Sequence, residues 1–245
     1  MVNGLYTARN GMMLLQEMVD NTTNNLANAN TSGFKKSLMA SISEVQNKRN
    51  DENRLHHDES HWMSENRINW EQGSLVETQN SMDVAIQGNG FLSVETPDGV
   101  RYTRSGNLTR NGLGEVVTLQ GYKVLDQGGG PIVAEGDRFQ VSSSGSISTN
   151  GQVAGQLAVV DFADRTQLER EGRNTYKLRE GSDQAPTAAE NFELKQGFVE
   201  ASNVNVVDSM VELIRFQRNY ELNQKAATSE DETLQKAVND IGRVG

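Results

Sequence analysis

The one concentration of side chains that could bind a metal or transfer protons is the run HHDESH at residues 56–61. His57 and His61 stand four residues apart, the spacing with which zinc hydrolases of the H-E-x-x-H type place two imidazoles on one helix face. Those enzymes also need a glutamate directly after the first histidine, and here that residue is Asp58. A catalytic metal further requires a third ligand and a dry, shaped cavity, whereas this stretch is strongly hydrophilic. The sequence therefore predicts a solvated surface cluster without a metal.

Two glycine-rich stretches, GNG at 88–90 and GGG at 128–130, could expose backbone N–H groups to a phosphate. The first lacks the third glycine of G-x-G-x-x-G and runs into the strand-like FLSV. The second has no Lys-Ser/Thr after it and meets Pro131. Both patterns instead indicate tight turns that need a positive φ.

Other catalytic patterns are equally weak. All three histidines lie in one hydrophilic stretch and no G-x-S-x-G elbow is present, so a Ser-His-Asp triad is unsupported. Carboxylates are plentiful, but the sequence gives no separation between any two of them that would indicate glycoside hydrolysis. We therefore predict no catalytic, cofactor-binding or metal residues, and a protein that is not an enzyme.

The composition narrows the set of partners. The formal net charge of −10 argues against nucleic acid, since proteins that bind it need a basic surface. No apolar run approaches the roughly 20 residues of a membrane helix, which argues against membrane insertion. A cleavable signal peptide is not recognisable, so we expect a cytosolic protein or one exported by a route that reads no cleaved signal. Cysteine is absent, which excludes disulfides and thiolate ligands.

Both ends of the chain carry apolar residues in alternating steps of three and four, the spacing of a heptad seam. The N-terminal series is Leu5, Ala8, Met12, Leu15, Val19, Thr22 and Leu26. The C-terminal series is Val206, Met210, Leu213, Gln217, Tyr220, Gln224, Ala227, Asp231, Leu234, Val238 and Ile241. An ordinary amphipathic helix packed on its own domain would give the same pattern over a short segment. Asn203 or Asn205 could cap the second helix.

Between the helices the pattern changes. Residues 36–71 are hydrophilic without a sustained period, which predicts an extended linker segment. From about residue 72 to 202, short β-rich runs alternate with Gly, Asn and Asp, which predicts a mainly antiparallel β domain with hairpins. We therefore expect an α+β fold: a heptad helix over 1–35, the linker, the β domain, and a second heptad helix over 203–245.

Four blocks of sequence resemble the axial rod and hook family of flagellar proteins. They are NNLANANTSGFKK at 24–36, SMDVAIQGNGFLSV at 81–94, YTRSGNLTRNGLGEVVTLQGYKVL at 102–125, and the stretch from QGFVEASNVNVVDSM onward at 196–239. The blocks cover about half of the chain and occur in the family's order. Short length and the GGPI stretch at 129–132 resemble the proximal-rod branch, and the Gly-x-Gly-Val segment of the distal-rod branch is missing.

This resemblance implies a structural subunit of the flagellar basal-body rod that transmits torque from motor to hook. It implies that the helices over 1–35 and 203–245 pair as a coiled coil lining the inner tube, and that the protein forms a helical homo-oligomer with neighbouring rod proteins. It also implies flagellar type III export and residence in the periplasmic rod. The expected assembly interface comprises Leu5, Ala8, Met12, Leu15, Val19, Asn24, Asn25, Leu26, Asn28, Met210, Leu213, Ile214, Gln217, Tyr220, Gln224, Ala227 and Leu234. The asparagines could form hydrogen bonds between subunits.

The asparagine-rich block also has a local consequence. Asparagine side chains compete for backbone hydrogen bonds, so the first helix should fade near residues 28–30, with Gly33 supplying a turn conformation. Three alternatives remain: a distal-rod subunit, a peptidoglycan-acting enzyme, and a soluble adhesin or chaperone-like binder with terminal helices. Self-association separates the last of these, since an adhesin should be stable as a monomer.

Overall fold

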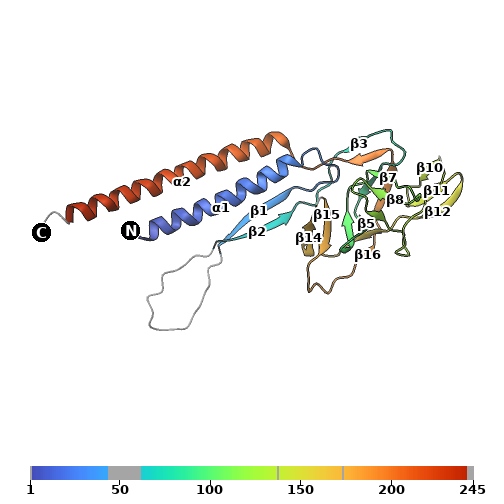
Figure 1. Ribbon diagram of the computed structural model, residues 1–245, viewed down its shortest axis with the longest axis horizontal. Coiled ribbons are helices and arrows are strands. Elements are labelled where there is room, and N and C mark those ends of the chain that lie inside the picture. The colour runs from blue at the N-terminus through green and yellow to red at the C-terminus, as the bar shows by residue number, and fades with distance from the viewer. Residues whose placement is uncertain (1, 44–61, 137, 173, 242–245) are drawn as a thin grey trace. The chain divides into compact units, whose positions relative to one another are not determined.

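The computed structural model describes residues 2–43, 62–136, 138–172 and 174–241, which form two units (Figure 1). The helical unit takes its described residues from Met1–Ala27, Ser37–Asn69 and Asn205–Gly245. The β unit consists of Asn28–Lys36 and Trp70–Val204. The chain thus passes between the units four times, and the short piece Asn28–Lys36 belongs to the β unit although both of its flanks belong to the helical unit.

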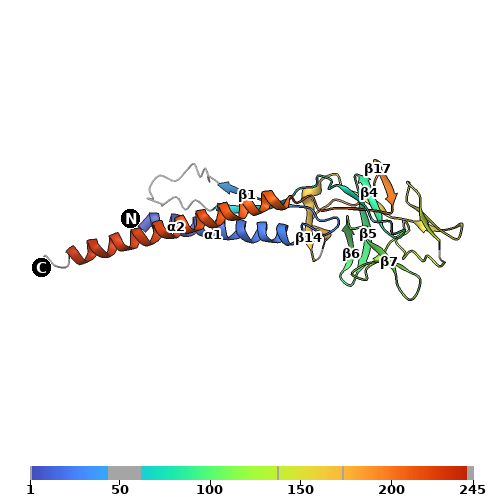
Figure 2. The same ribbon diagram turned by 90° about the horizontal axis from the view of Figure 1, so that it is seen from above.

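Two helices and one pair of strands make up the helical unit. Helix α1 (Val2–Ala27) and helix α2 (Val206–Ile241) lie side by side and antiparallel, and the start of α1 and the end of α2 are at the same end of the pair (Figures 1 and 2). Strands β1 (Ser37–Ser43) and β2 (Trp62–Ile68) pair antiparallel. The segment expected to be a linker therefore contains a two-stranded ladder.

The helix ends follow the residues that flank them. The Asn205 side chain accepts hydrogen bonds from the backbone N–H of Val207 (3.0 Å) and Asp208 (3.4 Å), which confirms it as the N-cap of α2. Helix α1 ends at Ala27, directly before the turn that begins at Asn28, and Gly33 has φ of 72°. The predicted fading of the first helix and the role of Gly33 are both confirmed.

The β unit contains the remaining strands and one short 3-10 helix. These elements are β3 (Leu75–Glu77), β4 (Val84–Gly88), β5 (Phe91–Thr96), β6 (Gly99–Thr103), β7 (Leu108–Arg110), β8 (Val116–Thr118), β9 (Lys123–Val124), β10 (Phe139–Val141), β11 (Ser146–Thr149), β12 (Gln152–Gln156), β13 (Val159–Asp161), η1 (Arg165–Gln167), β14 (Leu168–Glu171), β15 (Thr175–Leu178), β16 (Thr187–Ala188), β17 (Phe192–Gln196) and β18 (Phe198–Glu200). All of their pairings among the described residues are antiparallel, as the sequence predicts.

One sheet dominates the β unit, with strand order β14-β15-β6-β5-β9-β8-β7 and with β13 and β16 joined to it through β5. The strands β10-β11-β12 form a second sheet, and β17-β4 and β18-β3 are separate pairs. Both glycine-rich stretches are turns, since Gly88, Gly90 and Gly129 have positive φ. This confirms the predicted tight turns with positive φ.

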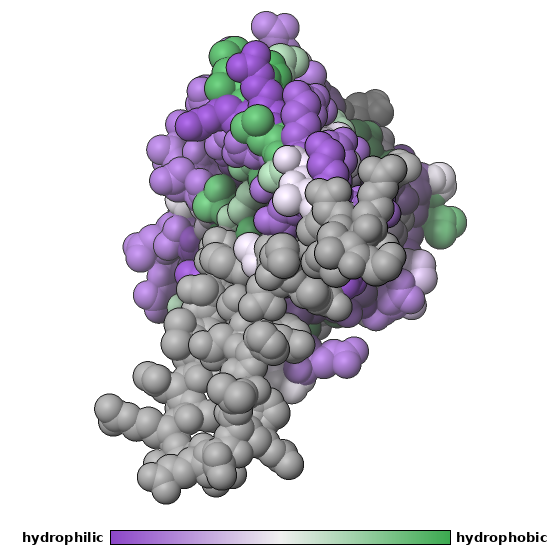
Figure 3. Space-filling model, turned by 90° about the vertical axis from the view of Figure 1, so that its left-hand side faces the viewer, coloured by the Kyte–Doolittle hydropathy of each residue, from purple (hydrophilic) through white to green (hydrophobic). Residues whose placement is uncertain are grey.

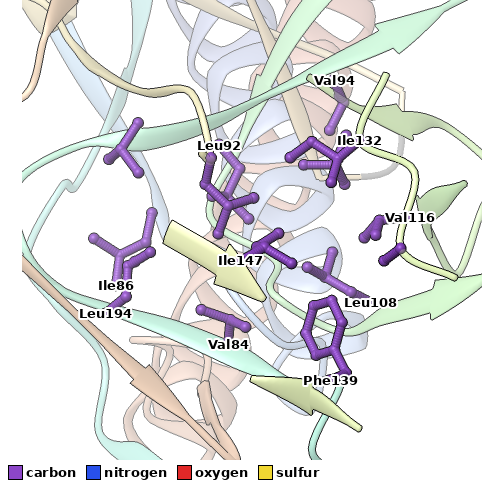
Figure 4. Packing of buried hydrophobic residues seen from close by; sticks show 14 residues of the cluster. Val84, Ile86, Leu92, Val94, Leu108, Val116, Ile132, Phe139, Ile147 and Leu194 are labelled. Atoms are coloured by element: carbon purple, nitrogen blue, oxygen red, sulfur yellow. The ribbon is translucent and has the colours of Figure 1, made fainter. Parts of the chain in front are cut away.

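The core of the β unit is formed by apolar side chains from several of these strands. Val84 and Ile86 of β4, Leu92 of β5, Leu108 of β7 and Ile147 of β11 point toward one another, and each is at most 2% exposed (Figure 4). Full burial of such a side chain contributes about 1.5–3 kcal/mol. The core joins β4 to β11, so it holds the separate sheets together.

The described surface is mainly polar. Hydrophilic residues predominate on the visible face of the space-filling view, with smaller hydrophobic patches between them (Figure 3). Neither α1 nor α2 has a described stretch both long and apolar enough to cross a lipid bilayer.

Candidate functional site

The predicted seam of α1 lies on its more buried face. Ala8, Met12, Leu15, Val19 and Leu26 are all half-buried, while Thr22, on the same line, is buried. The side chain of Leu5 lies outside the described residues. These positions recur every three to four residues, which is the period of a single helix face.

The stripe that α2 buries runs along a line adjacent to the predicted one. Its members are Ser209, Leu213, Phe216, Tyr220, Asn223 and Ala227, of which Ser209 is fully buried and the others half-buried. The predicted residues Leu213, Tyr220 and Ala227 belong to this stripe, whereas Met210, Ile214, Gln217 and Gln224 are exposed. The side chain of Leu234 lies outside the described residues.

Small and polar residues explain this choice of face. A Cβ added to Gly11 of α1 would lie at an ordinary contact distance, 3.7 Å, from the side-chain nitrogen of Asn223 in α2, so these two positions face each other across the helix pair. The sequence prediction chose the line through Met210 because it counted apolar residues. Such a count gives no weight to small or polar residues such as Ser209 and Asn223, which lie on the face that is buried. The apolar residue Phe216, which the predicted series omits, could have indicated the buried line from the sequence.

A groove with a volume of about 460 Å³ runs between the two helices. It is lined by Thr7, Asn10, Gly11, Leu14, Leu15, Asn219, Leu222 and Asn223. Leu222 is 63% exposed, so its side chain forms an open apolar edge of the groove.

The opposite face of α2 carries a second apolar stripe, which we call the outer stripe: Val207, Met210, Val211 and Ile214. These residues are between 48% and 67% exposed. Their spacing of three and four residues puts them on one side of the helix, away from the stripe that contains Ser209 and Leu213. Such contiguous exposure of apolar side chains is typical of a protein-protein contact.

The three asparagines of the predicted interface have different surroundings. Asn25 is 1% exposed; its side chain accepts from the Ser37 N–H (2.8 Å) and donates to the Ser37 carbonyl (2.7 Å). Asn24 is exposed, and the half-buried Asn28 accepts a hydrogen bond from the Thr31 hydroxyl (3.2 Å). The amide of Asn25 thus joins α1 to β1 within the chain, as a strand residue would.

The end of the same sequence block contains a buried charge that the sequence did not reveal. Lys35 is fully buried, and its ammonium donates to the Glu200 carboxylate (2.5 Å) and to the Glu71 carbonyl (2.7 Å). Arg104 approaches the other carboxylate oxygen of Glu200 at 3.5 Å. Burial lowers the pKa of both Lys35 and Arg104, and Glu200 opposes this shift in each case.

The described residues contain no group of three or more His, Asp or Glu side chains that could hold a metal. His56, His57 and His61 lie outside the described residues, so the prediction that they form a solvated cluster stays a prediction. The features that stand out are the groove, the outer stripe and the buried Lys35.

Three family models match successive parts of the chain. Residues 5–35 match the model described as "Flagella basal body rod protein", residues 85–155 match "Flagellar hook protein FlgE/F/G D1 domain", and residues 195–240 match "Flagellar basal body rod FlgEFG protein C-terminal". The first and third matches contain most of the residues that form α1 and α2.

Similar proteins align with the chain from end to end. The flagellar basal-body rod protein FlgG of Bacillus subtilis is 33% identical over 272 residues, which cover 98% of this chain and 99% of the relative. FlgF of Caulobacter vibrioides is 32% identical over 249 residues, with both chains fully covered. The flagellar hook-basal body complex protein FlhO of Bacillus subtilis is 32% identical over 273 residues, again with full coverage.

Proposed function

This chain belongs to the flagellar basal-body rod protein family, and from that premise we propose that it builds the rod by packing its terminal helices against those of further copies. It is a structural subunit of the rod and not an enzyme, as the family indicates. The peptidoglycan-acting enzyme considered above is thereby set aside. The observation that carries the assembly proposal is the outer stripe, an apolar face left uncovered on α2.

The occupant of this face is the helix pair of a second copy. The outer stripe offers branched and thioether side chains such as Ile214 and Met210, and the groove offers Leu14, Leu15 and the open edge at Leu222. Because the stripe and the groove are different surfaces of one chain, their contact is heterologous, and repeated heterologous contacts generate helical arrays. The predicted residues Gln217 and Gln224 are exposed near the stripe and would fix its register.

The position that we assign is the proximal rod. The alignment with the FlgF relative needs 249 positions for this chain of 245 residues, whereas the FlgG relative needs 272, so the FlgF alignment requires fewer gaps. A distal-rod position is the alternative, because the two identities, 32% and 33%, are nearly the same. We also propose that the protein contacts neighbouring rod proteins, is exported by the flagellar type III apparatus, and transmits torque in the periplasmic rod.

Substitution of the outer stripe tests the assembly mode. Ile214→Asp puts a charge where an apolar contact is proposed, so we expect the variant to be exported but not incorporated, leaving cells non-motile. Leu113→Asp is the matched control, because Leu113 is also exposed (75%) but lies in a turn of the β unit. Motility and basal-body composition are measured for both. Normal incorporation of Ile214→Asp would contradict the proposal.

Imaging decides the position in the rod. A small epitope can be inserted after Gly181, since a Cβ built on that residue meets no atom within 4 Å. Electron microscopy of labelled basal bodies should place the epitope at the end of the rod nearest the inner membrane. Label along the outer part of the rod would favour the distal alternative.

A further inference from the structure

Residues 31–36, which we call the strap, lie in the β unit like a bound peptide. The Gly33 N–H donates to the Glu200 carbonyl (2.7 Å), and the Asn203 N–H donates to the Phe34 carbonyl (3.3 Å). The Lys36 N–H donates to the side chain of Asn203 (2.6 Å). The backbone of the strap is thus held along the segment that follows β18, as an added strand would be.

Side chains of the β unit hold the strap from another direction. The guanidinium of Arg170 lies 4.1 Å from the ring centroid of Phe34, which is 3% exposed, and it also donates to the Lys35 carbonyl. The Asn174 side chain donates to the Ser32 carbonyl (2.6 Å). Both side chains come from the β14-β15 hairpin region, so two separate parts of the β unit form the site.

The deepest part of this site recognises an ammonium group. Lys35 reaches the buried carboxylate of Glu200, whose Oε1 also accepts the Gly73 N–H (3.0 Å). The Glu71 carbonyl accepts a second hydrogen bond from the same ammonium. A carboxylate that also accepts a backbone N–H is held in place for the lysine, as in a preorganised binding group.

Gly33 makes close approach of the strap possible. A Cβ added to Gly33 would lie 2.5 Å from the carbonyl carbon of Arg104, and Gly33 has φ of 72°, so both space and conformation require glycine. The sequence that the site selects is therefore glycine, an aromatic residue and lysine in succession.

In the part of the chain that the structure describes, the site leaves some of its buried polar atoms without hydrogen bonds. Arg104 Nε, Arg170 Nε, Asn174 Oδ1 and Glu200 Oε2 are buried without a hydrogen-bond partner among the described residues. Unsatisfied buried polar atoms and desolvated charges oppose the gain from the contacts. We propose that the β unit carries a binding site for the Gly33-Phe34-Lys35 peptide, with Glu200 as the group that recognises the lysine, and that the strap docks in it reversibly.

A peptide supplied in trans tests the binding site. In the full chain, Gly33→Ala should prevent docking by the clash with Arg104, while Gly121→Ala is the control, because Gly121 has φ of 87° and no atom within 4 Å of an added Cβ. We expect Gly33→Ala to lower the thermal unfolding midpoint more than the control does. A synthetic peptide of residues 30–37 should restore the midpoint saturably, and the same peptide with Lys35→Ala should not. Equal midpoints for the two variants, or no response to the peptide in a folded Gly33→Ala, would overturn the proposal.

Amide exchange of the unmodified protein tests reversibility even if Gly33→Ala does not fold. The Gly33 and Lys36 amides should exchange together, at least about tenfold faster than the Ser93 and Leu125 amides of the core, because release of the strap is a local opening. Exchange of all four at one rate would show that the strap leaves only with global unfolding, and the proposal would be wrong.

Discussion

Glu115 and Lys123 form the ion pair whose titration is simplest to follow. Their nitrogen and oxygen atoms are 2.9 Å apart, and Asn111 also donates to Glu115 (2.6 Å). The hydrogen bond from Lys123, and then that from Asn111, hold the pKa of Glu115 below its ordinary value of 4.5. The hydrogen bond to Glu115 raises the pKa of Lys123 above its ordinary 10.5.

These shifts predict a stability window. The contribution of Glu115 is complete above pH 4.5 and is lost as the pH falls through its folded pKa; that of Lys123 is complete below pH 10.5 and is lost as the pH rises through its folded pKa. Glu115→Gln should remove both of these contributions. The difference in stability between this variant and the unsubstituted protein should therefore be greatest between pH 4.5 and pH 10.5. Thermal unfolding midpoints from pH 3 to about 11 measure this difference. A difference that does not vary with pH would contradict the assignment.

At the scale of elements, the Asn25 amide is the joint between α1 and β1. Asn25→Ala removes the hydrogen bond to the Asn21 side chain and both hydrogen bonds to Ser37. It leaves the buried Ser37 N–H and carbonyl without these partners, a cost of about 2–4 kcal/mol by the usual range for such groups. We expect faster amide exchange along the β1-β2 ladder. Thr23→Ala, an exposed position one turn earlier than the end of α1, should leave that ladder unchanged. Equal protection in both variants would show that other contacts hold β1.

The elements could be foreseen from sequence to the extent that their signals are local. Heptad spacing located both helices, one of the two proposed caps, Asn205, marked the start of α2, and the strand-like FLSV after the GNG stretch anticipated β5 (Phe91–Thr96). The sequence SLMASIS of β1 does alternate apart from Met39, a strand signal that the expectation of a linker missed. The sequence WMSENRI of β2 does not alternate, so its pairing depends on the partner strand more than on its own residues. The buried line of α2 was displaced because the helices meet at Gly11 and Asn223, a property of the pair.

For the candidate site, the same limit is stronger. From the sequence alone, Lys35, Arg104 and Glu200 would be placed on the surface, because Lys, Arg and Glu are almost never fully buried unless they are paired. No periodicity relates positions so far apart in the chain, and their meeting follows from the tertiary fold alone. The predicted interface residues remain candidates for contacts between subunits, since the structure of one chain does not contain a second copy.

At the scale of the whole molecule, the isolated β unit should reach its full stability only with its strap. The sequence analysis placed the β domain at about residues 72–202, whereas the β unit also includes Asn28–Lys36 and extends from Trp70 to Val204. Because the Asn203 side chain contacts both Lys36 N–H (2.6 Å) and the Glu71 carbonyl (3.0 Å), a short Gly-Ser linker can replace residues 37–69. We expect the fragment 28–36, linker, 70–204 to unfold cooperatively.

The shorter fragment 72–198, which lacks the strap and Glu200, is the comparison. It should have a lower unfolding midpoint or bind hydrophobic dyes as an incompletely packed state. Scanning calorimetry on both fragments measures the difference. Equal midpoints and equal cooperativity would mean that the strands 72–198 contain all of the folding information of the unit.

The contact between Lys35 and Glu200 joins residues 165 positions apart. Ring closure over such a distance is slow, because chain entropy is lost before the contact forms. Whichever end of the chain emerges first from a narrow passage, the strap and its site are both free only after almost the entire sequence has passed. The order of these segments along the chain therefore delays the folding of the β unit. A partly released polypeptide lacks either the strap or its site, so the contact between Lys35 and Glu200 forms only when release is nearly complete.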